Sequence, residues 1–172
     1  MGGIILQLDD IDRRILEILQ HAGRTTNREL AKRVGLSPAP CWHRVKRLEQ
    51  AGMIDHYKAV LNTTLAGQNF RALVGISLLS HSTSARQEFE DQIQAMENVQ
   101  ECYWFSGEIE YQLLVTAADL ADFEDFLQKK LLAIPVVSHA SPQVVLKEIK
   151  RTSTLPLDAV GQKTTMALVK AQ

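Results

Sequence analysis

Between Asp9 and Gly52 the sequence contains a close succession of helix start and stop signals. Asp9 is a favourable N-cap for a first helix, and a glycine follows its last apolar position. Thr26 and Glu29 have the spacing of a capping box, in which each side chain accepts from the other residue's backbone amide. Gly35 suits the left-handed position that ends a short second helix. Two helices followed by a tight turn are therefore predicted.

The stretch "SPAPCWHRVKRLE", which starts at Ser37, predicts a third helix. Pro38 falls at the first helical position, where its missing N–H costs no hydrogen bond. Cys41, Val45 and Leu48 recur at helical spacing and form one apolar face. The other side carries Trp42, His43, Lys46 and Arg47, with Arg44 on the flank. Two short helices, a tight turn and a longer basic helix are the layout of a helix-turn-helix.

A second interpretation of this stretch is a catalytic cysteine activated by a histidine. Residues two apart on a helix point about 200° away from each other, so Cys41 and His43 do not form that pair. Cys41 is therefore predicted to lie in the core. The histidines lack metal-ligand spacing, and no glycine-rich phosphate loop is present. We predict no metal site and no cofactor.

Charge is distributed unevenly along the chain. Residues 24–58 contain eight Lys/Arg and three Asp/Glu, whereas residues 63–172 contain nine Lys/Arg and thirteen Asp/Glu. A basic segment ahead of an acidic body suggests that only the front of the protein meets a polyanion such as DNA. The alternative is that these charges are scattered over a solvated surface.

Composition places the chain among globular proteins, with 45% hydrophobic and 23% charged residues. No apolar run approaches the roughly 18 residues that a membrane span requires, and "MGGIILQLDD" lacks the features of a signal peptide. Two cysteines do not make a disulfide framework. These features predict a soluble, cytoplasmic protein.

A polar, turn-rich stretch around residue 62 predicts a domain boundary, with one domain over 1–62 and another over 63–172. The first domain would end in a hinge strand over 53–61. The second domain reads as strand, helix, strand, strand, helix, strand, which is the ferredoxin-like βαββαβ sandwich. The predicted elements are strands over 72–79, 99–105, 111–117 and 136–149, with helices over 84–96 and from Asp119. The fold class is therefore α+β.

The residues from Leu8 to Ile54, together with the later "WFSGEIEYQLLV" and "TSTLPL", resemble the Lrp/AsnC family of transcriptional regulators. The resemblance covers roughly residues 8–157. It implies a winged-helix-like DNA-binding domain joined to an αβ-sandwich that binds an amino-acid effector. It also implies homodimers whose sheets pair and which commonly assemble into octamers.

The same resemblance makes residues 37–49 the recognition helix. His43 occupies a position where relatives often carry arginine, which would remove one charged contact to DNA. Helix starts and cations both favour phosphate, so residues of the second helix are included among the candidates. The predicted DNA-binding residues are Thr26, Asn27, Arg28, Ser37, Trp42, His43, Arg44, Lys46 and Arg47.

For the effector site the resemblance points to the turn over residues 106–111. Gly107 would permit an unusual backbone conformation, and Glu110 stands where the family usually has aspartate. Backbone amides and carboxylates in the turn would hold an amino acid's carboxylate and ammonium groups. The candidate residues are Gly107, Glu108, Glu110, Ser138 and His139. The alternative is a plain hairpin turn with solvated acids.

The sequence is compatible with three functions. The first is a sequence-specific transcriptional regulator, not an enzyme, whose DNA binding or assembly responds to an amino acid. The second is a DNA-organising protein without small-molecule control. The third is an enzyme built on the ferredoxin-like domain, which the absence of a nucleophile–base arrangement disfavours.

Overall fold

The computed structural model describes residues 8–107 and 109–157, which form two compact units. The first contains the described residues up to Ala59 together with residues 150–157, and the second spans Val60–Ile149. The sequence assigns everything after residue 62 to the second domain. Residues 150–157 instead pack on the first unit, because Leu157 is buried in its core and the Gln20 amide bonds both backbone groups of Leu155, at 2.6 and 3.2 Å.

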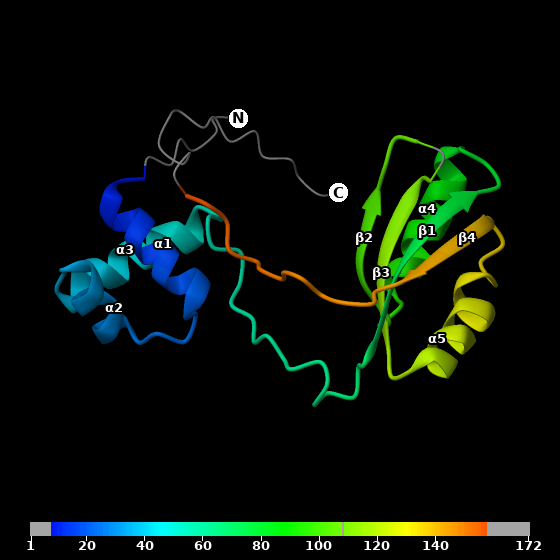
Figure 1. Ribbon diagram of the computed structural model, residues 1–172. Helices are drawn as coiled ribbons and strands as arrows, with labels where there is room; N and C mark the ends of the chain where they lie inside the picture. The colour runs from blue at the N-terminus through cyan, green and yellow to red at the C-terminus, as the bar shows by residue number, and fades with distance from the viewer. Residues whose placement is uncertain (1–7, 108, 158–172) are drawn as a thin grey trace. The chain divides into compact units, whose positions relative to one another are not determined.

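The first unit is the predicted helix-turn-helix. Its described residues form α1 (Asp10–His21), α2 (Asn27–Val34) and α3 (Pro38–Gln50), shown in Figure 1. The Asp9 N-cap and the Thr26–Glu29 capping box are confirmed. Gly35 has a φ of 74°, the left-handed conformation that lets the chain turn sharply from α2 into α3. Local capping signals thus place α1 and α2, and α3 starts with Pro38 at its first position, as predicted.

The core of this unit confirms the predicted apolar face of α3. Cys41 and Leu48 are fully buried and pack in one cluster with residues of α1 and α2, while Val45 is half-buried. The pKa of the Cys41 thiol is raised by burial, which disfavours the thiolate. Cys41 is a core residue, as predicted.

The predicted hinge strand over 53–61 is wrong. No strand occurs between Gln50 and Phe70, a stretch that the structure describes throughout. Met53 and Ile54 turn back on the end of α3, where their amides bond the Leu48 carbonyl oxygen at 3.0 and 3.4 Å. The apolar, β-branched composition of the segment is not sufficient, because a strand needs a neighbour and no described strand of this chain pairs with it.

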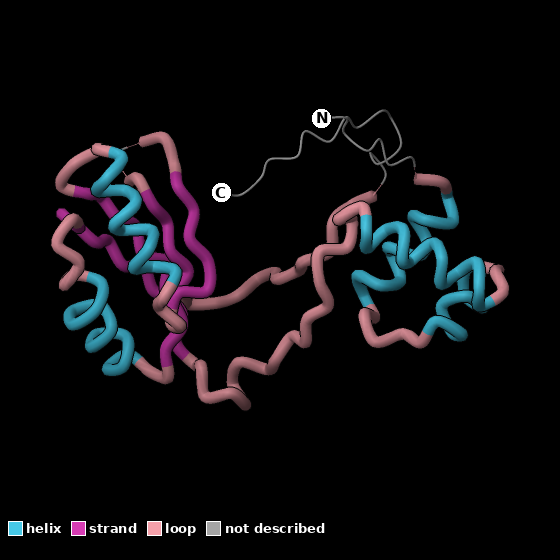
Figure 2. Tube along the Cα trace, turned by 180° about the vertical axis from the view of Figure 1, so that it is seen from behind, coloured by secondary structure: helices cyan, strands magenta, loops and turns pink. Residues whose placement is uncertain are grey.

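The second unit is a four-stranded antiparallel sheet with the strand order β2-β3-β1-β4. Its helices lie together on one face of the sheet, as two opposite views show (Figures 1 and 2). Together with the chain order, this confirms the ferredoxin-like sandwich. The elements are β1 (Phe70–Leu78), α4 (Thr83–Gln94), β2 (Val99–Trp104), β3 (Tyr111–Ala117), α5 (Leu120–Phe126) with a π-helical turn η1 (Leu127–Leu131), and β4 (Val137–Val144).

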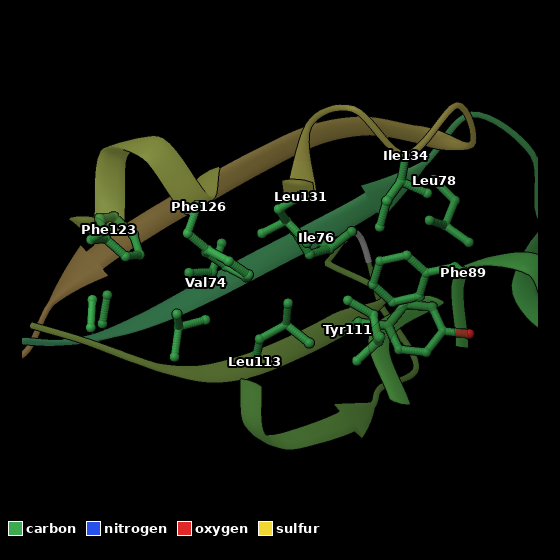
Figure 3. Close-up of a cluster of buried hydrophobic side chains, with 14 residues drawn as sticks. Val74, Ile76, Leu78, Phe89, Tyr111, Leu113, Phe123, Phe126, Leu131 and Ile134 are labelled. Atoms are coloured by element: carbon green, nitrogen blue, oxygen red, sulfur yellow. The ribbon is translucent and has the colours of Figure 1, made fainter. Parts of the chain in front are cut away.

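The core of this unit lies between the sheet and its helices. Alternate residues of β1 and β3 point into it, and the rings of Phe89 and Tyr111 pack with centroids 4.6 Å apart (Figure 3). β4 runs without a break through Pro142, which pairs with Val74, because β4 is an edge strand, where proline is tolerated. The other face of the sheet carries Leu73 and Tyr103, which are 38% and 55% exposed. That face lacks a covering layer of described residues.

Candidate functional site

The solvent-facing side of α3 is aromatic and basic. Trp42, His43, Lys46 and Arg47 are all exposed, on the side opposite the buried Cys41. The ring of His43 packs edge-on against that of Trp42, with centroids 5.0 Å apart and an interplanar angle of 75°. The structure therefore brings these four predicted side chains onto one accessible helix face.

Arg44 is less exposed than its neighbours on α3 and binds two carboxylates at the start of α1. Its Nη1 donates to Asp9 Oδ2 at 2.6 Å and to Asp12 Oδ1 at 2.9 Å. These hydrogen bonds raise the pKa of Arg44. The pKa of Asp9 is lowered, first by the hydrogen bond from the Asp12 amide, which outweighs partial desolvation, and then by Arg44. Arg44 thus ties α3 to the start of α1 instead of projecting to the surface.

Asp12 is the residue of this site that the sequence reasoning missed. It has no exposed surface, and its Oδ2 accepts from both the Asp9 amide, at 3.2 Å, and Arg47 Nη2. A local signal existed, because Asp9 and Asp12 have the spacing of a capping box, and the structure forms one. The contact of Asp12 with α3 had no such signal.

The remaining predicted DNA-binding residues lie at the starts of α2 and α3, apart from Lys46. The Thr26 hydroxyl is used in the capping box, and Asn27 Nδ2 donates to the Pro38 carbonyl oxygen at 2.8 Å. Ser37 stands at the N-cap of α3 without a side-chain capping bond. Arg28 is exposed, and Lys46 Nζ donates to Glu49 Oε2 at 2.7 Å on the surface.

The candidate effector residues gather at one end of the sheet. β1 ends there, β4 begins there, and the turn between β2 and β3 lies at the same end, on the side of β1 away from β4. The Glu110 amide donates to the Ile76 carbonyl oxygen at 2.9 Å, and the Ser138 hydroxyl donates to the Ser77 carbonyl oxygen at 2.8 Å. The sequence predicts Ser138 and His139 on a loop, but both belong to β4 and are exposed.

Glu110 is 6% exposed and is held by two partners. Its Oε2 accepts from the Leu78 amide at 2.8 Å, and its Oε1 pairs with Nδ1 of His81. Desolvation alone would raise its pKa, but the contacts with His81 and the Leu78 amide outweigh it, so the pKa of Glu110 is lowered. His81 is the second residue that the sequence reasoning missed, since it lies far from the turn in sequence and is adjacent to no predicted motif.

Gly107 does not have the conformation that the sequence suggested. The glycines with positive φ in the described residues are Gly35, Gly52 and Gly67. A Cβ at Gly107 would meet no atom within 4 Å, so neither backbone strain nor a close neighbour requires glycine here. The turn instead packs through Ile109, which lies over Gly75, where a Cβ would come within 3.1 Å of it. Glu108 lies outside the described residues.

Comparison with known proteins assigns both units. Residues 8–55 match the winged helix-turn-helix DNA-binding model, and residues 71–155 match the Lrp/AsnC ligand binding domain. The chain is 42% identical over 150 residues to the leucine-responsive regulatory protein of Haemophilus influenzae, covering 87% of this chain and 90% of the relative. The corresponding protein of Escherichia coli K12 is 39% identical, with 86% and 90% covered. The chain belongs to the Lrp/AsnC family.

Solved structures of Lrp/AsnC proteins have the same fold. A transcriptional regulator of Neisseria meningitidis in complex with L-Met matches with a TM-score of 0.85 and 38% identity, covering 88% of this chain and 98% of that chain. AsnC of E. coli matches with a TM-score of 0.78 and 25% identity, covering 88% and 100%. This Lrp/AsnC protein is therefore a DNA-binding transcriptional regulator with a ligand-binding domain, and the family is not enzymatic.

Two further properties of this Lrp/AsnC chain concern its described residues alone. None of the helices within 8–107 and 109–157 is long and apolar enough to cross a membrane. The same residues contain no cluster of three or more His, Cys, Asp or Glu side chains placed to hold a metal ion.

Proposed function

We propose that α3 is the recognition helix and that Trp42, His43, Lys46 and Arg47 face the major groove. The observation that carries this proposal is the single exposed face they form, opposite the buried Cys41. Arginine suits guanine edges and phosphate, lysine suits phosphate, and an aromatic ring packs on sugar or thymine methyl groups. His43, when neutral, accepts or donates a hydrogen bond without adding charge.

Arg28 is the proposed phosphate contact from α2, because it is exposed in the first turn of that helix. Thr26 caps the start of α2, and the Asn27 side chain binds the Pro38 carbonyl oxygen at the start of α3, where Ser37 makes no capping bond. Hydrogen bonds from the Thr26 hydroxyl and amide hold the pKa of Glu29 below its usual range, so a charged carboxylate stands at the start of α2. This charge disfavours a phosphate at that helix start, and it moves the proposed phosphate contacts toward Arg28 and α3.

We further propose a homodimer formed through the uncovered face of the sheet, with higher assembly up to an octamer. The exposed Leu73, Tyr103 and Ile109 on or over that face support this proposal. Two recognition helices would then enter successive major grooves about 34–36 Å apart.

The proposed effector is an amino acid bound at the sheet end that carries Glu110, Ser138 and His139. A relative solved with L-Met supports the ligand class. In this chain the Glu110 carboxylate is engaged by the Leu78 amide and His81, so its role is to set the local charge and hold the turn. The effector would act by favouring one assembly or DNA-binding state over another, which requires unequal affinity for the two.

The DNA contacts are tested by the double variant Lys46→Ala/Arg47→Ala, with Lys129→Ala/Lys130→Ala on η1 as a charge-matched control. Fluorescence anisotropy with duplex DNA should show weaker binding for the α3 variant alone. Each lost phosphate contact should reduce the slope of log K against log salt by about 0.9. Equal affinity and slope for both variants would mean that the interface lies elsewhere.

The effector is tested by a thermal-shift screen against the twenty amino acids, starting with L-Met and L-Leu, with and without DNA. A ligand at 100 times its Kd should stabilise the folded state by about 2.7 kcal/mol. A hit whose affinity changes with DNA would demonstrate coupling between the sites. Stabilisation by DNA but by no amino acid would favour the DNA-organising alternative.

A further inference from the structure

Asp12 is an unusual residue for the first turn of an exposed helix, because its carboxylate is completely buried. Its Oδ1 accepts from Arg44 Nη1 at 2.9 Å, and its Oδ2 accepts from the Asp9 amide at 3.2 Å and from Arg47 Nη2. The carboxylate is therefore held from its own helix on one side and contacts α3 on the other. A carboxylate held in this way restricts the positions of the guanidinium groups that bind it.

The two guanidinium groups on Asp12 are not equivalent. The side chain of Arg44 is 27% exposed, and its Nη1 donates to Asp9 as well as to Asp12, so it binds two carboxylates. The side chain of Arg47 is 49% exposed, and its hydrogen bond to Asp12 uses Nη2. The guanidinium has five N–H donors in a planar fork. Arg47 is thus held at Nη2 by a single carboxylate, and its side chain is half exposed, four residues along the helix from His43.

We propose that Asp12 is a positioning residue that directs Arg47 toward a base edge in the major groove, and so contributes to sequence discrimination instead of general DNA affinity. The inference rests on the proposed function, in which this face of α3 meets DNA. An arginine that donates two parallel hydrogen bonds to guanine O6 and N7 must present its fork in one plane. An anchored guanidinium loses less conformational freedom when it does so than a freely rotating one.

The buried carboxylate has an opposite effect on binding that ignores sequence. Its negative charge lies beside the surface that meets phosphate, so it weakens attraction to any duplex. Removing the charge should therefore strengthen non-specific binding while it weakens specific binding. Damage to the fold of α3 would lower both together, and a simple charge effect would raise both together.

The experiment compares the full-length wild type with Asp12→Asn and with the control Asp10→Asn. Asp10 stands at the same helix start and carries the same charge, but it is exposed and pairs with Arg13 of its own helix at 2.9 Å. Dissociation constants are measured by fluorescence anisotropy, over a range of salt, for a duplex selected by the wild type from a random pool and for a scrambled duplex. Thermal melts identify the temperature range in which each variant is folded.

We expect Asp12→Asn to lose about tenfold in its preference for the selected duplex, the size of one good arginine–guanine contact. Its affinity for the scrambled duplex should match or exceed that of the wild type, as in Asp10→Asn. Arg47→Lys, which keeps the charge but lacks the planar fork, should show the same loss of preference with an unchanged salt slope.

Two results would overturn the proposal. Asp12→Asn behaving as Asp10→Asn on both duplexes would reduce Asp12 to a background charge. Parallel weakening on both duplexes, with Arg47→Lys retaining full preference, would make Asp12 purely structural. Failure of the proposed function is recognised separately, because Lys46→Ala/Arg47→Ala would then bind both duplexes as the wild type does.

Discussion

Asp12 in the helix-turn-helix unit and Glu110 in the sandwich unit are both nearly inaccessible carboxylates, at 0% and 6% exposure, but their partners differ. Asp12 is bound by two arginines, whose charge is permanent over the accessible pH range. Glu110 is bound by a backbone amide and by His81, which carries charge only when protonated. Two buried acids of similar exposure are therefore held by different groups. Asp12 is held by two arginines, whereas Glu110 is held by a backbone amide and a histidine.

The largest loss of stability is expected for Asp12→Ala, which leaves the guanidinium groups of Arg44 and Arg47 without their shared carboxylate partner. Breaking a buried pair costs roughly 3–5 kcal/mol, and we expect about 3 kcal/mol because both arginines can reach water. Tryptophan fluorescence can follow the unfolding of each unit separately, because Trp42 lies in the first unit and Trp104 in the second. Guanidinium chloride unfolding followed by Trp42, in a Trp104→Phe background, measures the change. The exposed control Asp10→Ala should cost less than about 1 kcal/mol, and equal costs would contradict the comparison.

A smaller loss is expected for Glu110→Gln, which keeps the shape of the side chain but removes its charge. Hydrogen bonds to a charged group contribute about 1.5–3 kcal/mol, so the second unit should lose about 2 kcal/mol. The measurement follows Trp104 in a Trp42→Phe background at neutral pH. Glu101→Gln, at an exposed acid that accepts from Tyr103 at 3.1 Å, is the control and should be nearly neutral. If Glu110→Gln is as stable as the wild type, the pair with His81 contributes nothing.

The pH dependence of that difference tests whether the charged form of Glu110 stabilises the second unit. The pKa of Glu110 is lowered in the folded state relative to its ordinary value of 4.5. Its contribution is therefore fully present above about pH 4.5 and is lost as the pH falls through the lowered folded value. The stability gap between wild type and Glu110→Gln should shrink on acidification below that point. A gap that widens in acid would mean that the carboxyl group is more stable in its protonated form in the folded protein.

The smallest loss of stability is expected for Gln20→Ala, which removes the contact that holds residues 150–157 on the first unit. The Gln20 side-chain amide donates to the Leu155 carbonyl oxygen and accepts from the Leu155 amide, and both hydrogen bonds are exposed and uncharged. We expect a loss of about 1 kcal/mol and faster hydrogen exchange of the Leu155 amide. Gln50→Ala, at an exposed position at the end of α3, serves as the control. Unchanged exchange would mean that Leu157 alone holds the segment.

The sequence by itself determined the elements and their faces. The Asp9 N-cap, the Thr26–Glu29 capping box and the left-handed Gly35 all act within a few residues of where they stand. The burial of Cys41 and the exposure of Lys46 followed from helical periodicity in the same way. Capping interactions and helical periodicity involve residues that are close in sequence, so they can be predicted from the sequence alone.

The tertiary structure decided which charged groups meet. Arg44 and Arg47 find Asp12 across 32 and 35 residues, and His81 finds Glu110 across 29. Tertiary packing also decided that the predicted hinge strand over 53–61 does not form and that residues 150–157 pack on the first unit. Such contacts depend on how helices and strands pack against one another, and sequence spacing carries no information about that packing. The sequence therefore predicted a basic face on α3, whereas packing brought both of its arginines to Asp12 and left Arg47 the more exposed of the two.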